Sequence, residues 1–132
     1  MHSIKYFLSI TAALFFLFTT CSRSNADVNT WQTITAEEAY RMMNELDNYI
    51  LLDVRTVSEY NEIRINDAIL IPDYEIKQRA KTELPDKNAV ILIYCRSGRR
   101  SALAAAVLAE LGYTNVYDFG GIINWPYETV RG

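Results

Sequence analysis

Histidine is almost absent from this chain of 132 residues, whose single histidine is His2. A catalytic pair of cysteine and histidine, or a triad of serine, histidine and aspartate, therefore has no histidine available beyond the extreme N-terminus. The sequence also lacks the ligand spacing of a metal site, so we expect neither a metal nor another cofactor. An excess of positive charge is missing as well. The formal charge is −3, which argues against nucleic acid as a partner.

The chain also lacks an apolar stretch long enough to cross a membrane. Its longest one, residues 6–18, has 13 mostly apolar residues, whereas a membrane-spanning helix needs about 20. This length is typical of the apolar part of a secretory signal, which follows a positive residue such as Lys5. We therefore expect residues 1–20 to be a signal peptide that directs export from the cytoplasm.

The sequence allows two ends for this signal. The letters FTTC, which end at Cys21, resemble the lipobox of bacterial lipoproteins, in which the cysteine is lipidated and becomes the first residue. Phe18 and Thr20 differ from the leucine and the glycine or alanine that are usual there. The alternative is cleavage after Ala26, which ends the small-residue stretch SNA. We expect the lipoprotein form, anchored to the membrane; with either end, the mature protein is exported to the periplasm of a bacterium.

Cysteine is scarce, with two in the whole chain. Because Cys21 is lipidated or removed, Cys95 is the only thiol in the expected folded domain, residues 33–132, which follows a polar tether at residues 21–32. A lone cysteine in an exported domain indicates a reactive thiol or an intermolecular bridge. The alternative is a buried cysteine that packs as a small apolar residue. The surrounding letters YCRSGRRS favour reactivity, because they place three arginines beside the thiol.

Short apolar runs alternate with helical patterns along the rest of the chain. The patterns predict strands at residues 49–54, 68–72, 89–95 and 115–119, and helices at residues 35–46, 57–63, 74–84 and 101–113, with a final short helix at 120–125. This alternation is typical of parallel strands joined by right-handed crossovers. We therefore expect one layered α/β domain.

The strand at residues 89–95 is apolar on both faces, as a central strand covered by helices would be. Ligands bind at the carboxyl ends of such strands, where Cys95 stands, and the loop after it leads into the N-terminus of a helix. The free N–H groups and the dipole of a helix N-terminus stabilise a thiolate, and Arg96, Arg99 and Arg100 add positive charge. Gly98 lets the loop curl so that its amides point inward. A basic loop that only caps a helix would leave the lone thiol unexplained.

Two stretches of the sequence resemble the rhodanese family of sulfurtransferases. They are VILIYCRSGRRSALAAAVLAELGYTNVYDFGGIINW, residues 90–125, and LLDVRTVSEYNEIRINDAILIP, residues 51–72. The resemblance covers residues 33–127 and implies a three-layer sandwich whose mostly parallel, five-stranded sheet is flanked by helices. It also implies a sulfurtransferase in which Cys95 takes a sulfane sulfur and becomes a persulfide.

The resemblance further implies roles for the loop that follows the cysteine. Backbone N–H groups of residues 96–101 would hold the outer sulfur, while Arg96 and Arg100 would attract a small anionic donor such as thiosulfate. Ser97 and Ser101 would donate hydrogen bonds, although Ser101 could instead cap the helix. The acceptor implied is a thiol, cyanide or the cysteine of a protein.

The DVR letters that hold Asp53 and Arg55 match another part of the family pattern. We expect these residues to support the site, with Arg55 in a structural ion pair with Glu59. Two departures stand nearby, since Arg64 replaces a usual histidine and Asp67 a usual glycine. We expect Asp67 to take a left-handed conformation, which aspartate tolerates better than most residues, and Arg64 to add positive potential near the mouth of the site.

Two other functions remain open on the sequence. Cysteine phosphatases and arsenate reductases have a similar loop, but with five residues between cysteine and arginine, whereas four stand between Cys95 and Arg100. A shorter ring suits a single sulfur atom better than a tetrahedral phosphate. The second alternative is a binding module that has the fold without the activity, although such modules typically lack the nucleophile.

Overall fold

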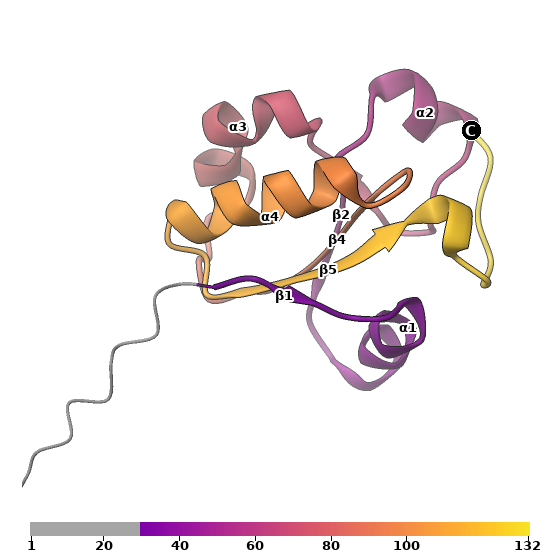
Figure 1. Ribbon diagram of the computed structural model, residues 1–132, viewed down its shortest axis with the longest axis horizontal. Coiled ribbons are helices and arrows are strands. Elements are labelled where there is room, and N and C mark those ends of the chain that lie inside the picture. The colour runs from indigo at the N-terminus through magenta and orange to yellow at the C-terminus, as the bar shows by residue number, and fades with distance from the viewer. Residues whose placement is uncertain (1–29) are drawn as a thin grey trace, which may run out of the picture.

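The computed structural model describes residues 30–132, which form one sheet of five strands between layers of helices (Figure 1). The strands are β1 (Gln32–Thr33), β2 (Ile50–Asp53), β3 (Ile69–Leu70), β4 (Val90–Cys95) and β5 (Asn115–Gly121), and they lie in the order β1-β5-β4-β2-β3. Every neighbouring pair is parallel. The predicted α/β fold with five strands is therefore confirmed, and the sheet is parallel throughout rather than mostly parallel.

The expected N-terminal features lie outside the described residues. These are the signal at residues 1–20, the lipidation site Cys21 and the alternative cleavage after Ala26. The end of the expected tether, residues 21–32, overlaps the fold, because Gln32 already belongs to β1. Within the part that the structure describes, no helix is both long and apolar enough to cross a membrane.

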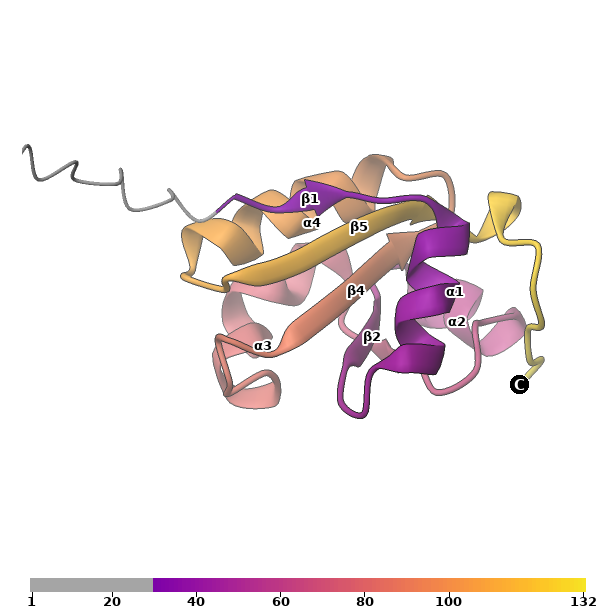
Figure 2. The ribbon, with the colours of Figure 1, turned by 90° about the horizontal axis from the view of Figure 1, so that it is seen from below.

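The helices cover both faces of the sheet. They are α1 (Ala36–Glu45), α2 (Val57–Glu62), α3 (Ile76–Glu83) and α4 (Arg99–Glu110), with two short 3₁₀ turns, η1 (Asp73–Glu75) and η2 (Ile122–Asn124). α1 lies on one face, and α3 and α4 lie side by side on the other (Figures 1 and 2). The short helix α2 lies near the carboxyl ends of the strands, so it stands close to the loop that joins β4 to α4 (Figure 1).

Strand β4 occupies the centre of the sheet because both of its faces are apolar. Ile91, Ile93 and Cys95 pack in the core beneath α3 and α4, while Leu92 and Tyr94 pack in the core on the α1 side. All five side chains are at most 1% exposed. Burying one large aliphatic side chain contributes about 1.5–3 kcal/mol, so this strand is a rigid base for the residues that follow it.

Some boundaries differ from the sequence prediction for physical reasons. α4 begins at Arg99, two residues before the predicted start, because Gly98 turns the chain into the helix with a φ of 105°. The helix predicted at 74–84 divides into the 3₁₀ turn η1 and α3. β1 was not predicted, since two exposed residues give no apolar pattern. Asp67 has a φ of 63°, which confirms the predicted left-handed conformation.

Candidate active site

The loop from Cys95 to Arg99 connects the central strand with the N-terminus of α4. Cys95 ends β4 and is 1% exposed. Its Sγ accepts a hydrogen bond from the backbone N–H of Gly98 at 3.0 Å, which requires the loop to curl back on the thiol. Gly98 is also the N-cap of α4 and offers no side chain to the first turn. Free amides at that helix start are therefore available to an anion next to the sulfur.

The end of β5 and the residues after it contact the backbone of the loop. The backbone N–H of Ile123 in η2 donates to the carbonyl of Arg96 at 3.2 Å, and Gly121 pairs with Cys95 across the sheet. A Cβ on Gly121 would overlap the backbone of Arg96 and Ser97. The two backbones approach so closely that only glycine fits at this position. The loop can therefore pack directly against the end of β5.

Ser101 lies inside this arrangement and is fully buried. Its Oγ is within hydrogen-bonding distance of the carbonyls of Gly98, at 3.1 Å, and Gly120, at 3.3 Å. Because Gly98 is the N-cap of the helix, Ser101 is not a cap, and its hydroxyl joins the loop to β5 instead. The buried Asp118 accepts from the N–H of Gly120 at 3.0 Å. Burial raises the pKa of Asp118, while hydrogen bonds from Ser101 and Gly120 oppose that rise.

Arg100 is bound to Glu59 of α2 by two hydrogen bonds of 2.8 Å. The pKa of Glu59 is lowered to about 2, chiefly by the hydrogen bond from Arg100, with burial acting in the opposite direction. Glu59 also accepts from the backbone N–H and the Oγ1 of Thr56, each at 3.0 Å, which completes a capping box at the start of α2. One carboxylate therefore links α2 to the far end of the loop.

The predicted ion pair between Arg55 and Glu59 is wrong. Arg55 is instead paired with Asp53, with its Nε and Nη2 donating to the carboxylate at 2.6–3.1 Å, and both side chains are at most 2% exposed. Nη2 of Arg55 also donates to the carbonyl of Ile63 at 2.6 Å, and the guanidinium lies 5.5 Å from the centre of the Tyr94 ring. The pair is thus a buried tie between β2 and the chain that follows α2. The expected role of Asp53 and Arg55 in supporting the site stays a prediction.

The other polar side chains of the loop are exposed to solvent. Arg96, Ser97 and Arg99 are exposed, and neither arginine forms an ion pair with any residue from 30 to 132. Arg64 does not join them, since its guanidinium lies 4.8 Å from the centre of the Tyr60 ring. That contact does not neutralise its charge, so the expected contribution of Arg64 to the potential stays a prediction. Within the loop, Arg96 and Arg99 carry the unpaired positive charge.

Sequence reasoning missed two residues of this site, Asp118 and Thr56. Thr56 stands three places before Glu59, the same spacing that suggests a capping box at Thr35 and Glu38. At that first position only the bond from the Glu38 N–H to Thr35 is present, whereas the complete box belongs to Thr56 and Glu59. The same search could therefore have found Thr56, but a single aspartate in a strand gives no comparable signal.

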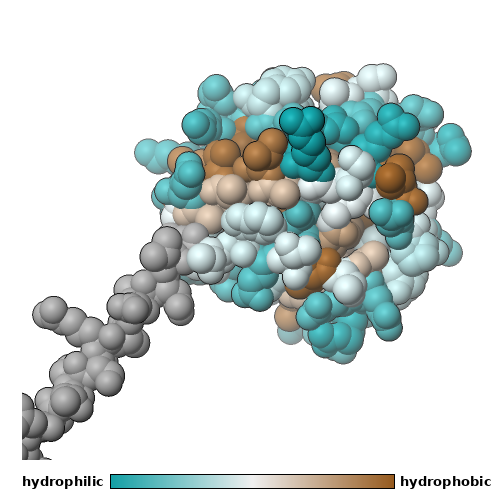
Figure 3. Space-filling model, in the orientation of Figure 1, coloured by the Kyte–Doolittle hydropathy of each residue, from teal (hydrophilic) through white to brown (hydrophobic). Residues whose placement is uncertain are grey.

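A small hollow lies beside the loop, with a volume of about 240 Å³. Its walls come from the end of β2, from α2, from the loop and from η2, and they are formed by Arg55, Glu59, Glu62, Ile63, Arg96, Ile122 and Ile123. On the surface, an apolar patch over α4 and another near η2 are separated by strongly hydrophilic side chains at the start of α4 (Figure 3). The site therefore combines positive charge with apolar walls.

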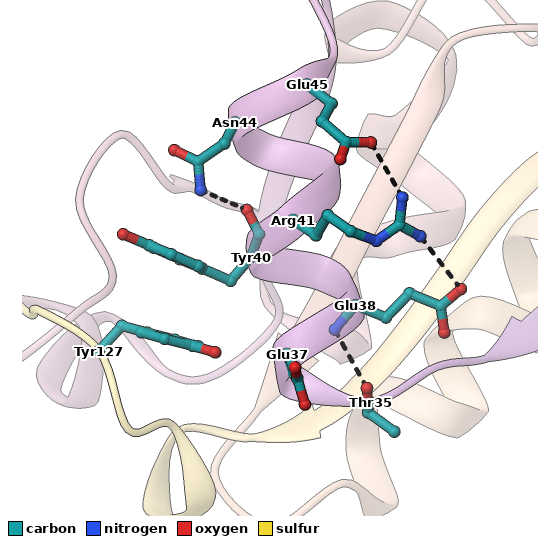
Figure 4. Close-up of a pocket in the computed structure, with 8 residues that line it drawn as sticks. All are labelled: Thr35, Glu37, Glu38, Tyr40, Arg41, Asn44, Glu45 and Tyr127. Carbon is teal, nitrogen blue, oxygen red and sulfur yellow. Dashed lines mark hydrogen bonds and ion pairs between the residues drawn. The ribbon is translucent and has the colours of Figure 1, made fainter.

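A second hollow lies over α1, where Tyr127 stacks on Tyr40 with ring centres 3.8 Å apart (Figure 4). Its polar side chains bind one another: Arg41 pairs with Glu38 and Glu45. It contains no residue of the loop around Cys95. The thiol of Cys95 and the arginines of its loop lie at the carboxyl ends of the strands, so this hollow is separate from the candidate active site.

Known proteins are similar to this chain in sequence. Residues 35–126 match the family described as the Rhodanese-like domain. The thiosulfate sulfurtransferase PspE of Escherichia coli is 40% identical over 81 residues, which are 61% of this chain and 78% of that protein. A sulfurtransferase of Allochromatium vinosum is 38% identical over 93 residues, covering 70% of this chain and 85% of that protein.

Solved structures are similar as well. A rhodanese with anions from E. coli has a TM-score of 0.60 at 38% identity and covers 64% of this chain and 99% of its own. A rhodanese-related protein from Thermoplasma volcanium has a TM-score of 0.65 at 30% identity and covers 75% of this chain and 97% of its own. With its site at the strand ends and a match across most of the described residues, the chain belongs to the rhodanese-like family and is a sulfurtransferase.

Proposed function

We propose that the chain moves a sulfane sulfur from a small anionic donor to a thiol or cyanide through a persulfide on Cys95. The observation that supports this most is the placement of the Cys95 Sγ, which accepts the Gly98 N–H at the uncapped start of α4. A negatively charged sulfur bound there gains hydrogen bonds from amides that are already oriented toward it.

In the first step the Cys95 thiolate attacks the outer sulfur of a donor such as thiosulfate. A bond forms between Sγ and that sulfur, the sulfur–sulfur bond of the donor breaks, and sulfite leaves with the bonding electrons. The product is an anionic persulfide on Cys95, so no proton is transferred in this step. A site without a general base is sufficient for such an exchange.

In the second step the acceptor attacks the outer sulfur of the persulfide. A thiolate forms a new sulfur–sulfur bond, the bond to Sγ breaks, and Cys95 leaves as a thiolate that is ready for another cycle. Cyanide gives thiocyanate in the same way. Total charge is conserved in both steps, and backbone N–H groups near the helix start remain bonded to whichever sulfur carries the negative charge.

The arginines of the loop have different parts in this proposal. Arg100 is neutralised by Glu59, so we assign it the positioning of the loop. Arg96 and Arg99 are exposed and unpaired among the described residues, and we assign to them the attraction of the anionic donor. Asp53 and Arg55 are buried against each other, so we assign to them the support of the strand end.

Replacing the nucleophile tests the proposal. We expect Cys95→Ser to abolish transfer from thiosulfate to cyanide, because a hydroxyl does not form a persulfide, while the circular-dichroism spectrum and the melting temperature stay close to those of the wild type. Treating the wild type with thiosulfate should increase its intact mass by one sulfur atom, and the variant should show no increase. Full activity in the variant would rule out Cys95 as the nucleophile.

The same preparation separates the competing function. An aryl phosphate offered beside thiosulfate measures phosphatase activity directly. We expect turnover of thiosulfate only, since four residues separate Cys95 from Arg100 and the ring is small for a tetrahedral phosphate. Hydrolysis of the aryl phosphate at a comparable rate would contradict the assignment.

A further inference from the structure

The hollow beside the loop has unpaired charges of both signs. Neither Arg96 nor Glu62 forms an ion pair with any residue from 30 to 132, and both side chains are exposed. The other two charged residues of the walls are already engaged, Arg55 by Asp53 and Glu59 by Arg100. One cation and one anion therefore face this hollow without a partner from the described part of the chain.

The rest of the wall is apolar. Ile63, Ile122 and Ile123 line the hollow, and Ile123 is 62% exposed, so its side chain is open to a ligand. The N–H of Ile123 is bonded to the carbonyl of Arg96, so the apolar wall is fixed to the loop. A ligand here would place a short apolar part between a group that binds arginine and a group that binds glutamate.

The volume limits the size of that ligand. About 240 Å³ corresponds to roughly eight water molecules at about 30 Å³ each, and it is smaller than the pockets that hold drug-sized molecules. A free amino acid of the size of cysteine has a similar number of non-hydrogen atoms. A simple anion would meet repulsion from Glu62, and a simple cation would meet it from Arg96.

The hollow lies beside the loop that carries the reacting cysteine. Arg96 follows Cys95 directly, and Glu59 is bonded to Arg100. We propose that this hollow is the acceptor subsite and that it selects a small thiol carrying an amino-acid group, with the carboxylate on Arg96 and the ammonium on Glu62. This inference rests on the proposed persulfide of Cys95 and names the acceptor that removes its sulfur.

The transfer itself needs no further reagent. The thiolate of the bound acceptor attacks the outer sulfur of the Cys95 persulfide, its new sulfur–sulfur bond replaces the one to Sγ, and Cys95 leaves as a thiolate. The carboxylate can accept two hydrogen bonds from the guanidinium of Arg96, while Glu62 supplies only an exposed charge. Because the two contacts involve different groups of the acceptor, variants at Arg96 and at Glu62 test them separately.

Four thiols separate the two contacts. Cysteine carries both charged groups, cysteamine only the amine, mercaptopropionate only the carboxylate, and mercaptoethanol neither. The wild type is first loaded with thiosulfate, freed of excess donor, and then mixed with one thiol, and the loss of the extra sulfur from Cys95 is followed by intact mass. Such a single turnover reports the second step alone. For each thiol, the rate of sulfur loss in the wild type is divided by the rate in the variant. The intrinsic reactivity of the thiol cancels in this ratio.

We expect Glu62→Gln to slow transfer to cysteine and cysteamine about threefold, the effect of losing a partly exposed ion pair, and to leave mercaptopropionate and mercaptoethanol unchanged. Arg96→Gln should slow cysteine and mercaptopropionate relative to the other two. Glu110→Gln, which makes the same change of charge at the far end of α4, should alter none of the four.

The outcomes distinguish a failure of the acceptor subsite from a failure of the persulfide mechanism. If Glu62→Gln leaves all four rates unchanged or slows them by one common factor, the subsite is wrong while the persulfide mechanism stands. If the wild type gains no sulfur from thiosulfate, the proposed function fails at the loading step, before any acceptor is added, and the acceptor subsite fails with it.

Discussion

The carboxylate of Glu59 is bonded to two parts of the chain that are far apart in sequence. It accepts from Arg100 at the start of α4 and from Thr56 at the start of α2. Its side chain is 25% exposed and that of Arg100 is 29% exposed, so solvent screens the pair only in part. A buried or half-buried charge that loses its partner costs more than the pair itself contributes, and the loop around Cys95 therefore depends on Glu59.

We expect Glu59→Gln to lower the free energy of unfolding near neutral pH by about 1–3 kcal/mol. The pKa of Glu59 is about 2 in the folded protein against an ordinary 4.5. Because the folded-state pKa is the lower one, the stabilisation is complete above pH 4.5 and is lost as the pH falls through about 2. Urea denaturation of wild type and variant at pH 7 and at pH 3 measures the difference, which should shrink at the lower pH.

Asp47→Asn provides the control for this change of charge. Asp47 is exposed and makes no ion pair with the described residues, so its variant should match the wild type at both values of pH. An equal loss of stability in the Glu59 variant at pH 7 and at pH 3 would show that packing, rather than the charge of Glu59, is responsible.

At the scale of elements, the junction of β5 and η2 sets the position of the loop around Cys95. Gly121 has an ordinary φ of −122°, so its role is spatial and does not depend on left-handed geometry. A methyl group there would overlap the backbone of Arg96 and Ser97, and the loop would have to move away from β5. The hydrogen bond from Ile123 to the Arg96 carbonyl would weaken with it.

We expect Gly121→Ala to reduce sulfur transfer from thiosulfate to cyanide at least about tenfold, since misplacement of a catalytic group by about 1 Å can cost more than that. The cost in stability should be about 1–3 kcal/mol, as for other overpacked sites. Steady-state kinetics and thermal melting measure the two effects. Unchanged kinetics would show that the loop does not depend on this contact.

The sequence predicted most elements because their signals are local. The apolar run of β4 and the position of Cys95 at its end follow from the order of residues alone. The choice of ion-pair partners did not follow, because Arg55 and Arg100 are both close enough to compete for carboxylates. Only the folded arrangement shows that Asp53 occupies Arg55 and leaves Glu59 to Arg100. Asp118 was missed because a single aspartate in a strand gives no sequence signal, and its burial is visible only in the folded arrangement.

At the scale of the whole molecule, the parallel sheet brings its functional residues to one edge. β2 ends at Asp53, β4 at Cys95 and β5 at Gly121. Because all strands run in the same direction, these three ends meet although they are far apart in sequence. Residue 30, where the described chain begins, lies toward the opposite ends of the strands (Figure 1).

We propose that the mature chain is exported and anchored by a lipid on Cys21. Lipidation contributes about 0.8 kcal/mol for each buried methylene, and stable anchoring takes more than one acyl chain. In a bacterial host we expect the wild type in the membrane fraction, with an intact mass that includes the lipid, and Cys21→Ser in the soluble fraction with its sulfur transfer unchanged. We expect activity to be retained because Cys21 has no part in the transfer proposed for Cys95. If wild type and variant both have the intact mass of a chain that begins at Asp27, the signal is cleaved after Ala26 instead.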